Sequence, residues 1–68
     1  MGVRNRLKSF RHQKEMNQKE FAEWLGYNPR QYNRWELNRI QPDYENAFKI
    51  KEKLELKSID ELFEKAPD

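Results

Sequence analysis

The stretch that decides the fold is NQKEFAEWLGYNPRQYNRW, residues 17–35. Asn17 and Glu20 have the spacing of a capping box, in which each side chain bonds the other residue's backbone N–H at the start of a helix. Gly26 follows the apolar end of this first helix, where a residue with left-handed backbone commonly closes one. The stretch therefore predicts a short helix that ends in a tight turn.

A second short helix follows the turn. Asn28 is a suitable cap, and Pro29 suits the first helical position because its missing N–H would have no partner there. Tyr32, Trp35 and Glu36 share one side at i, i+3 and i+4. The opposite side is left with Arg30, Gln31, Asn33 and Arg34. Guanidinium and amide groups can pair bidentately with guanine and adenine, which suits a DNA-binding helix-turn-helix, but from these two helices alone a plain αα-hairpin stays the alternative.

The net charge of +2 hides an uneven distribution. Residues 1–14 contain five Lys or Arg and no acid, and residues 28–42 contain three Arg against one Glu. Residues 43–64 contain seven acids against four Lys. This segregation favours a polyanionic partner for the first two segments over a uniformly charged soluble surface.

The composition excludes several classes of protein. We expect a single domain over residues 1–68, with a core over about 3–65 and a frayed end at 66–68. Without cysteine, and with His12 as its one histidine, the chain offers no disulfide and no metal site, and we expect no cofactor. It has no glycine-rich phosphate loop and no nucleophile–histidine–acid set, which argues against an enzyme. No apolar run reaches membrane length and no signal peptide is present, so we expect a cytoplasmic protein with no membrane contact and no small-molecule ligand.

Three further helices are expected around the central pair. The first covers residues 3–14, and the fourth covers about residues 44–55 with Asp43 as its cap. Ser58 and Glu61 have the spacing of another capping box, which predicts a fifth helix over about residues 59–65. The predicted fold is all-α, with five helices.

Over residues 7–63 the chain resembles the phage repressor/Cro-like (XRE-type) helix-turn-helix family. The matching residues are Leu7, Phe10, Arg11, Asn17-Gln18, Phe21-Ala22, Leu25-Gly26, Tyr32, Arg34-Trp35-Glu36, Pro42, Ile50, Leu54 and Ile59-Asp60-Glu61-Leu62-Phe63. The resemblance implies a compact lambda-repressor-like domain that binds double-stranded DNA sequence-specifically as a small transcriptional regulator, a repressor. It places the helix after the turn in the major groove, and a homodimer on a palindromic site would supply enough contact surface.

The resemblance also implies roles for individual residues. Base contacts are expected from Arg30, Gln31, Asn33 and Arg34. Phosphate contacts are expected from Asn17, Gln18, Asn28, Asn38, Arg39 and Gln41. Local capping is the alternative for Asn17 and Gln18, and a solvated loop is the alternative for Arg39 and Gln41. Arg11 and Glu36 are expected to form a structural ion pair, although a DNA contact by Arg11 stays open.

A second function stays open at this point. The domain could keep the helix-turn-helix and act through protein contact, as an antitoxin or anti-repressor type of partner. Exposure of Trp24 and Tyr27 would motivate this alternative, and Trp24 lies off the apolar face formed by Phe21, Ala22 and Leu25. An exposed Trp24 would be an anchor for a partner, whereas a Trp24 that leans over the helix edge near Tyr27 would only cover core.

Overall fold

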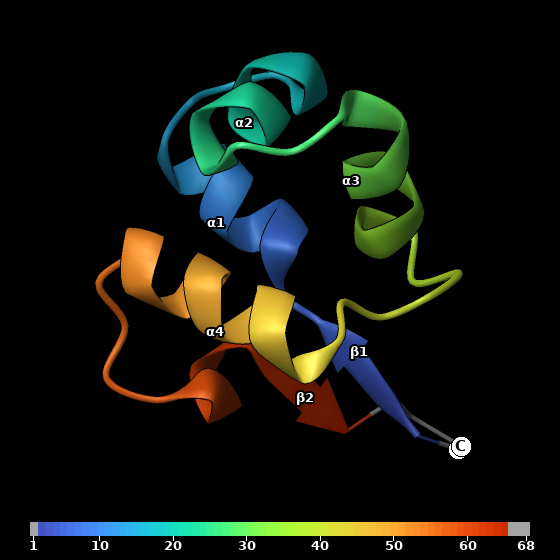
Figure 1. Ribbon diagram of the computed structural model, residues 1–68, viewed down its shortest axis with the longest axis vertical. Helices are drawn as coiled ribbons and strands as arrows, with labels where there is room; N and C mark the ends of the chain where they lie inside the picture. Colours follow the sequence, from blue (N-terminus) through green and yellow to red (C-terminus); the bar gives the residue numbers. More distant parts are fainter. Residues whose placement is uncertain (1, 66–68) are drawn as a thin grey trace.

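The computed structural model describes residues 2–65 and contains four α-helices, one 3-10 helix and two short strands within that range (Figure 1). In chain order the elements are β1 (Val3–Asn5), α1 (Leu7–Gln13), α2 (Gln18–Leu25), α3 (Pro29–Glu36), α4 (Tyr44–Lys53), the 3-10 helix η1 (Ile59–Leu62) and β2 (Phe63–Lys65). The fraying expected at residues 66–68 falls outside the described residues.

The expected all-α, five-helix fold is wrong at both ends of the chain. The first helix begins at Leu7, not at Val3, and the predicted fifth helix is one 3-10 turn followed by a strand. The two strands are antiparallel, with Arg4 opposite Glu64. The helical part of the prediction is confirmed for the four helices between these strands.

Asn5 explains why the chain does not enter α1 as a longer helix. Its side-chain oxygen accepts from the Leu7 N–H at 3.2 Å, so the chain turns at this point, and its amide nitrogen donates to the carbonyl of Trp35. At the other end, Ser58 and Glu61 form the predicted capping box, but Phe63 is already extended at φ −126° and ψ 158°. The pairing of β1 with β2 thus replaces further helix.

The turn signals at the centre of the chain are confirmed. The Asn17 side chain accepts from the Glu20 N–H at 2.8 Å, and the Glu20 carboxylate accepts from the Asn17 N–H at 2.9 Å. Gly26 closes α2 with a φ of 93°, a left-handed conformation that costs glycine little. Asn28 caps α3 by accepting from the Arg30 N–H at 2.8 Å. These local bonds fix the angle at which α3 leaves α2.

The core lies where the four helices meet above the strand pair (Figure 1). Its buried side chains are Leu7, Phe21, Ala22, Tyr32, Trp35, Ala47, Ile50 and Leu62. Aromatic rings join the two helices of the central pair, with Phe21 edge-to-face against Tyr32 at a centroid distance of 5.5 Å. Such contacts anchor the inner side of α3. Within residues 2–65, no helix is long and apolar enough to cross a membrane.

Candidate nucleic-acid interface

The helix α3 has one buried and one exposed side. Tyr32 and Trp35 are at most 3% exposed, and they form the inner side together with Glu36. Arg30, one turn before Arg34, is exposed, as is Arg34 itself. The inner side therefore holds the helix against the core and leaves its guanidinium groups on the surface.

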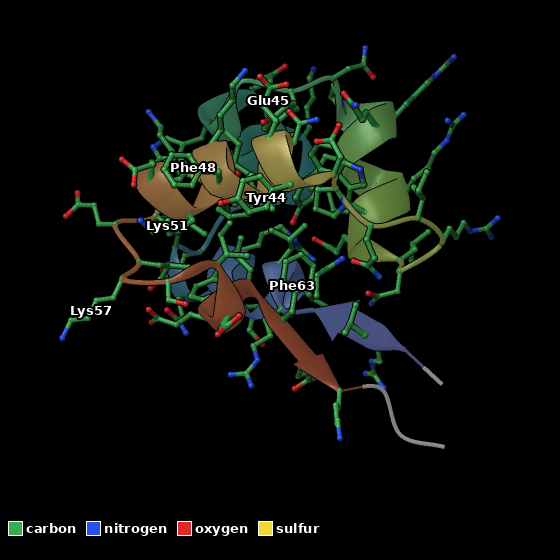
Figure 2. All side chains as sticks on the ribbon, turned by 60° about the horizontal axis from the view of Figure 1, so that its bottom comes forward. Tyr44, Glu45, Phe48, Lys51, Lys57 and Phe63 are labelled. Carbon is green, nitrogen blue, oxygen red and sulfur yellow. The ribbon has the colours of Figure 1, made fainter. Side chains whose placement is uncertain are left out.

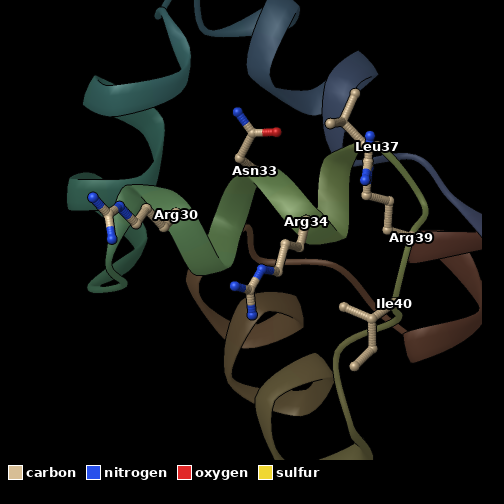
Figure 3. Close-up of a pocket in the computed structure, with 6 residues that line it drawn as sticks. All are labelled: Arg30, Asn33, Arg34, Leu37, Arg39 and Ile40. Atoms are coloured by element: carbon tan, nitrogen blue, oxygen red, sulfur yellow. The ribbon is translucent and has the colours of Figure 1, made fainter.

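The outer side of α3 continues into the following loop as a shallow depression of about 490 Å³. Figure 3 shows Arg30 and Arg34 projecting from the helix, with Arg39 on the loop beyond it. The depression is lined by Arg30, Asn33, Arg34, Leu37, Arg39 and Ile40, and none of these is acidic. Among residues 2–65, no hydrogen bond or ion pair holds the guanidinium of Arg30, Arg34 or Arg39.

This surface has the chemistry of an anion-binding site that can also form hydrogen bonds with the polar edges of bases. Guanidinium groups that lack an intramolecular partner can donate to phosphate or to base acceptors without first breaking a protein contact. Leu37 and Ile40 add apolar surface, since they are 56% and 57% exposed. Neither of these two residues is predicted from the sequence as part of the site.

Behind the surface, a buried carboxylate fixes the orientation of α3. Glu36 is 7% exposed, and Arg11 binds both of its oxygens, with Nε at 2.8 Å from one and Nη2 at 3.1 Å from the other. The Tyr32 hydroxyl donates to the same oxygen as Arg11 Nε, and Gln18 Nε2 donates to the second oxygen at 2.8 Å. Arg11 is thereby occupied within the protein, as befits a structural residue.

The pKa values around Glu36 reflect this network. Burial by itself raises the pKa of the Glu36 carboxyl, but the hydrogen bonds from Arg11, Tyr32 and Gln18 together outweigh it and hold the pKa below its usual value. The hydrogen bond to Glu36 raises the pKa of Arg11. Burial and the neighbouring carboxylate raise the pKa of Tyr32. The charged pair and the neutral phenol are therefore the forms present near neutral pH.

Gln18 and Asn33 link the start of α2 to the middle of α3. The Asn33 amide donates to the Gln18 side-chain oxygen at 3.2 Å, while the Gln18 amide donates to Glu36. Each amide nitrogen carries two N–H groups, so one N–H on each side chain has no partner among residues 2–65. Asn33 also lines the depression on the outer side of α3, so its remaining N–H can serve a ligand there.

Asn17, Asn28 and Gln31 are exposed; the first two cap α2 and α3, and Gln31 lies in the first turn of α3. The side-chain oxygens of Asn17 and Asn28 are occupied by their capping bonds. Within residues 2–65 their amide N–H groups and the Gln31 side chain have no hydrogen-bond partner. All three residues thus keep donors that a nucleic acid could use.

Asn38 and Gln41 differ from the other predicted contacts because their side chains are occupied within the protein. The Asn38 oxygen accepts from the Asn5 N–H at 2.8 Å and from Gln41 Nε2 at 2.9 Å, and Gln41 accepts from the Asn5 amide at 2.8 Å. Asn38 also adopts a left-handed φ of 60°, as its place in a tight loop requires. Their predicted phosphate role stays a prediction, while their structural role is to join the loop to β1.

Asn5 also belongs to this region, although the sequence does not predict it. It is 7% exposed and bonds the loop after α3 through both its backbone and its side chain. The residue stands at the start of an amphipathic segment, where an asparagine is a usual cap, but its partners at positions 35, 38 and 41 are distant in sequence. The capping pattern alone therefore does not indicate that Asn5 is buried and bonded to the loop after α3.

Trp24 is half-buried and does not form an isolated exposed anchor. Its ring stacks on Phe21 at a centroid distance of 5.8 Å, and the ammonium groups of Lys14 and Lys53 lie 4.5 and 4.9 Å from its centroid. The Tyr27 ring instead packs against the Trp35 ring at a centroid distance of 4.9 Å, and the Tyr27 hydroxyl donates to the side-chain oxygen of Asn46. Trp24 and Tyr27, which motivated the protein-interaction alternative, therefore pack against other side chains of the same domain.

The comparisons with known proteins agree with this geometry. A family model described as helix-turn-helix matches residues 7–62, from the start of α1 to the end of η1. Comparison with curated proteins finds no match. Within residues 2–65 no group of His, Cys, Asp or Glu side chains could hold a metal ion. The chain belongs to the XRE-type (Cro/C1-like) helix-turn-helix family, a family of DNA-binding regulators.

Proposed function

We propose that this protein binds double-stranded DNA sequence-specifically and acts in the cytoplasm as a small transcriptional repressor. One observation carries the proposal: Arg30 and Arg34 are exposed one turn apart on α3, with no partner among residues 2–65, while Tyr32 and Trp35 turn inward. Two guanidinium groups on the outer side of a short helix match the acceptors that the major groove presents.

In the proposed complex, α3 lies in the major groove. Arg30 and Arg34 donate to guanine O6 and N7, and they set the sequence preference. Gln31 and Asn33 flank them and contact neighbouring bases, Gln31 through its free amide group and Asn33 through the amide N–H that does not bond Gln18. Leu37 adds an apolar contact at the far end of the depression. The resulting occupancy of an operator represses transcription because it excludes other proteins from that DNA.

Phosphate contacts set the register of the protein on the duplex. The N-terminus of α2 presents free backbone N–H groups, and an anion is favoured there by the helix dipole. Asn17 and Gln18 add amide donors at that end, Asn28 adds one at the N-terminus of α3, and Arg39 approaches the backbone from the loop after α3. These contacts carry no sequence information but supply much of the affinity.

The test measures fluorescence anisotropy with duplexes selected from a random pool, at several salt concentrations. The double variant Arg30→Ala/Arg34→Ala should lose its preference for the selected duplex over a scrambled one. Each good bidentate arginine–guanine pair is worth about 1–3 kcal/mol of discrimination, so the preference should fall by roughly 5- to 150-fold per arginine.

The matched control is Lys57→Ala/Lys65→Ala, which also removes two positive charges but at exposed positions away from α3. It should keep the sequence preference and lose at most some general affinity at low salt. A double arginine variant that binds the selected duplex with undiminished preference would show that α3 does not read the sequence.

A further inference from the structure

Two aromatic side chains lie exposed on α4, away from the proposed DNA-binding surface. Tyr44 is 76% exposed and Phe48 is 44% exposed, and their rings stack at a centroid distance of 6.4 Å with an interplanar angle of 26°. Figure 2 shows both in front of the α4 ribbon, with Phe63 of β2 below them. Adjacent exposed rings on a regular helix are an unusual use of aromatic residues unless something covers them.

The charges beside these rings are arranged along the helix axis. Glu45 lies in the first turn of α4 and Lys49 lies one turn later on the same flank, and both are exposed. Neither forms an ion pair among residues 2–65, whereas Lys51 pairs with Glu52 at 2.9 Å and lies over the Phe48 ring. An acidic group toward the N-terminus and a basic group toward the C-terminus are complementary to the same helix in reversed direction.

We propose that this face of α4 binds a second copy of the chain, with the two α4 helices antiparallel about a two-fold axis. In a two-fold contact each pairing occurs twice. Tyr44 of one copy meets Phe48 of the other, and Glu45 of one copy meets Lys49 of the other. The antiparallel arrangement also brings each helix N-terminus toward the other's C-terminus, which favours the pair electrostatically. The rings supply the apolar contact, and the charges select the direction.

The proposed pair is compatible with the proposed function and deepens it. In Figure 2, α4 presents Tyr44 and Phe48 toward the viewer, whereas α3 lies at the side of the molecule. Self-association through α4 therefore leaves the outer side of both α3 helices free. That such a pair would place two α3 helices on successive half-sites rests on the proposed function, but self-association itself does not.

The first measurement is sedimentation of the protein without DNA, from about 10 μM to about 1 mM, because a contact this small gives a weak dimer. The wild type should change from monomer to dimer across the series. Phe48→Ser should raise the dissociation constant by at least tenfold, and Arg30→Ala/Arg34→Ala should leave it unchanged. Circular dichroism checks that each variant keeps its helix content.

A charge exchange tests the pairing itself. Glu45→Lys and Lys49→Glu should each weaken the dimer, because each places like charges opposite one another. The double variant Glu45→Lys/Lys49→Glu should regain most of the lost affinity, since the two charges have simply changed places. An effect on helix stability alone would lower the helix content and would leave the double variant without specific rescue.

Two results would overturn the proposal. A wild type that stays monomeric over the whole series shows that no second copy binds this face, and a different partner then has to account for the aromatic pair. A dimer that Phe48→Ser leaves intact shows that the copies meet elsewhere. Loss of DNA sequence preference in a variant that still dimerises does not contradict the proposed dimer. The failure of this inference and that of the proposed function are therefore distinguishable.

Discussion

On the inner side of α3, the Glu36 carboxylate accepts hydrogen bonds from three side chains, whereas on the outer side the guanidinium groups of Arg30 and Arg34 have no partner among residues 2–65. Only a few residues separate these groups along one short helix. A buried charge with every lone pair used is a structural group, because removing any partner leaves the others desolvated. An exposed charge without a partner contributes little to folding and is available to a ligand. The comparison therefore assigns stability to one side of α3 and binding to the other.

The largest effect should come from Glu36→Ala. This change leaves the partly buried Arg11 guanidinium without its counter-ion and the buried Tyr32 hydroxyl without its acceptor, and it should lower the free energy of unfolding by about 3 kcal/mol. A chain of this length has roughly 3–10 kcal/mol in total, so the variant should be largely unfolded in mild urea. Urea denaturation followed by circular dichroism measures the loss. Unchanged stability would show that the Glu36 network does not hold α3 in place.

Acid should produce a smaller loss through the same carboxylate. The pKa of Glu36 in the folded protein lies below its usual value, which is about 4.3 in an unfolded chain. The unfolded state therefore takes up the proton first as the pH falls. The stabilising contribution is fully present above that unfolded pKa and is lost as the pH falls through the folded pKa. Thermal melts from pH 6 down to about pH 3 should show a steeper fall in Tm for the wild type than for Glu36→Gln.

Asn5→Ala should have an intermediate effect, because Asn5 joins β1 to the loop after α3. The change removes the bonds to Trp35 and Gln41 and leaves buried polar groups unsatisfied, which costs about 1–3 kcal/mol. Arg4→Ala in the same strand is the control, since its side chain is exposed and should matter by less than about 0.5 kcal/mol. Equal effects of the two changes would show that Asn5 is no more than a strand residue.

The range of the interactions in each region explains how much of the fold the sequence alone could predict. The central helices and their turns depend on signals within a few residues, such as Asn17 with Glu20 or Gly26 after an apolar run, and these predictions are confirmed. The inward side of α3 followed from the spacing of Tyr32 and Trp35 for the same reason. A short amphipathic segment with a cap and a periodic apolar side has few alternatives.

The two ends of the chain could not be predicted in this way. Whether residues 3–5 are helix or strand depends on residues 63–65, some sixty positions away, and on the bonds from Asn5 to the loop after α3. The capping box at Ser58 is real, but it says only where a helical turn begins and not how far it continues. Non-local pairing overrode local helical preference at both ends.

The smallest expected effect on stability is that of Arg30→Ala/Arg34→Ala. The two arginines lie at i and i+4 and repel each other by a few tenths of a kcal/mol, and alanine is the better helix former. The double variant should therefore unfold within about 0.5 kcal/mol of the wild type, or slightly above it, in the urea experiment used for Glu36→Ala. If it unfolded much earlier, the two guanidinium groups would have structural partners. The division of α3 into a structural side and a binding side would then be wrong, and any loss of DNA preference in this variant would have to be attributed to damage to the fold.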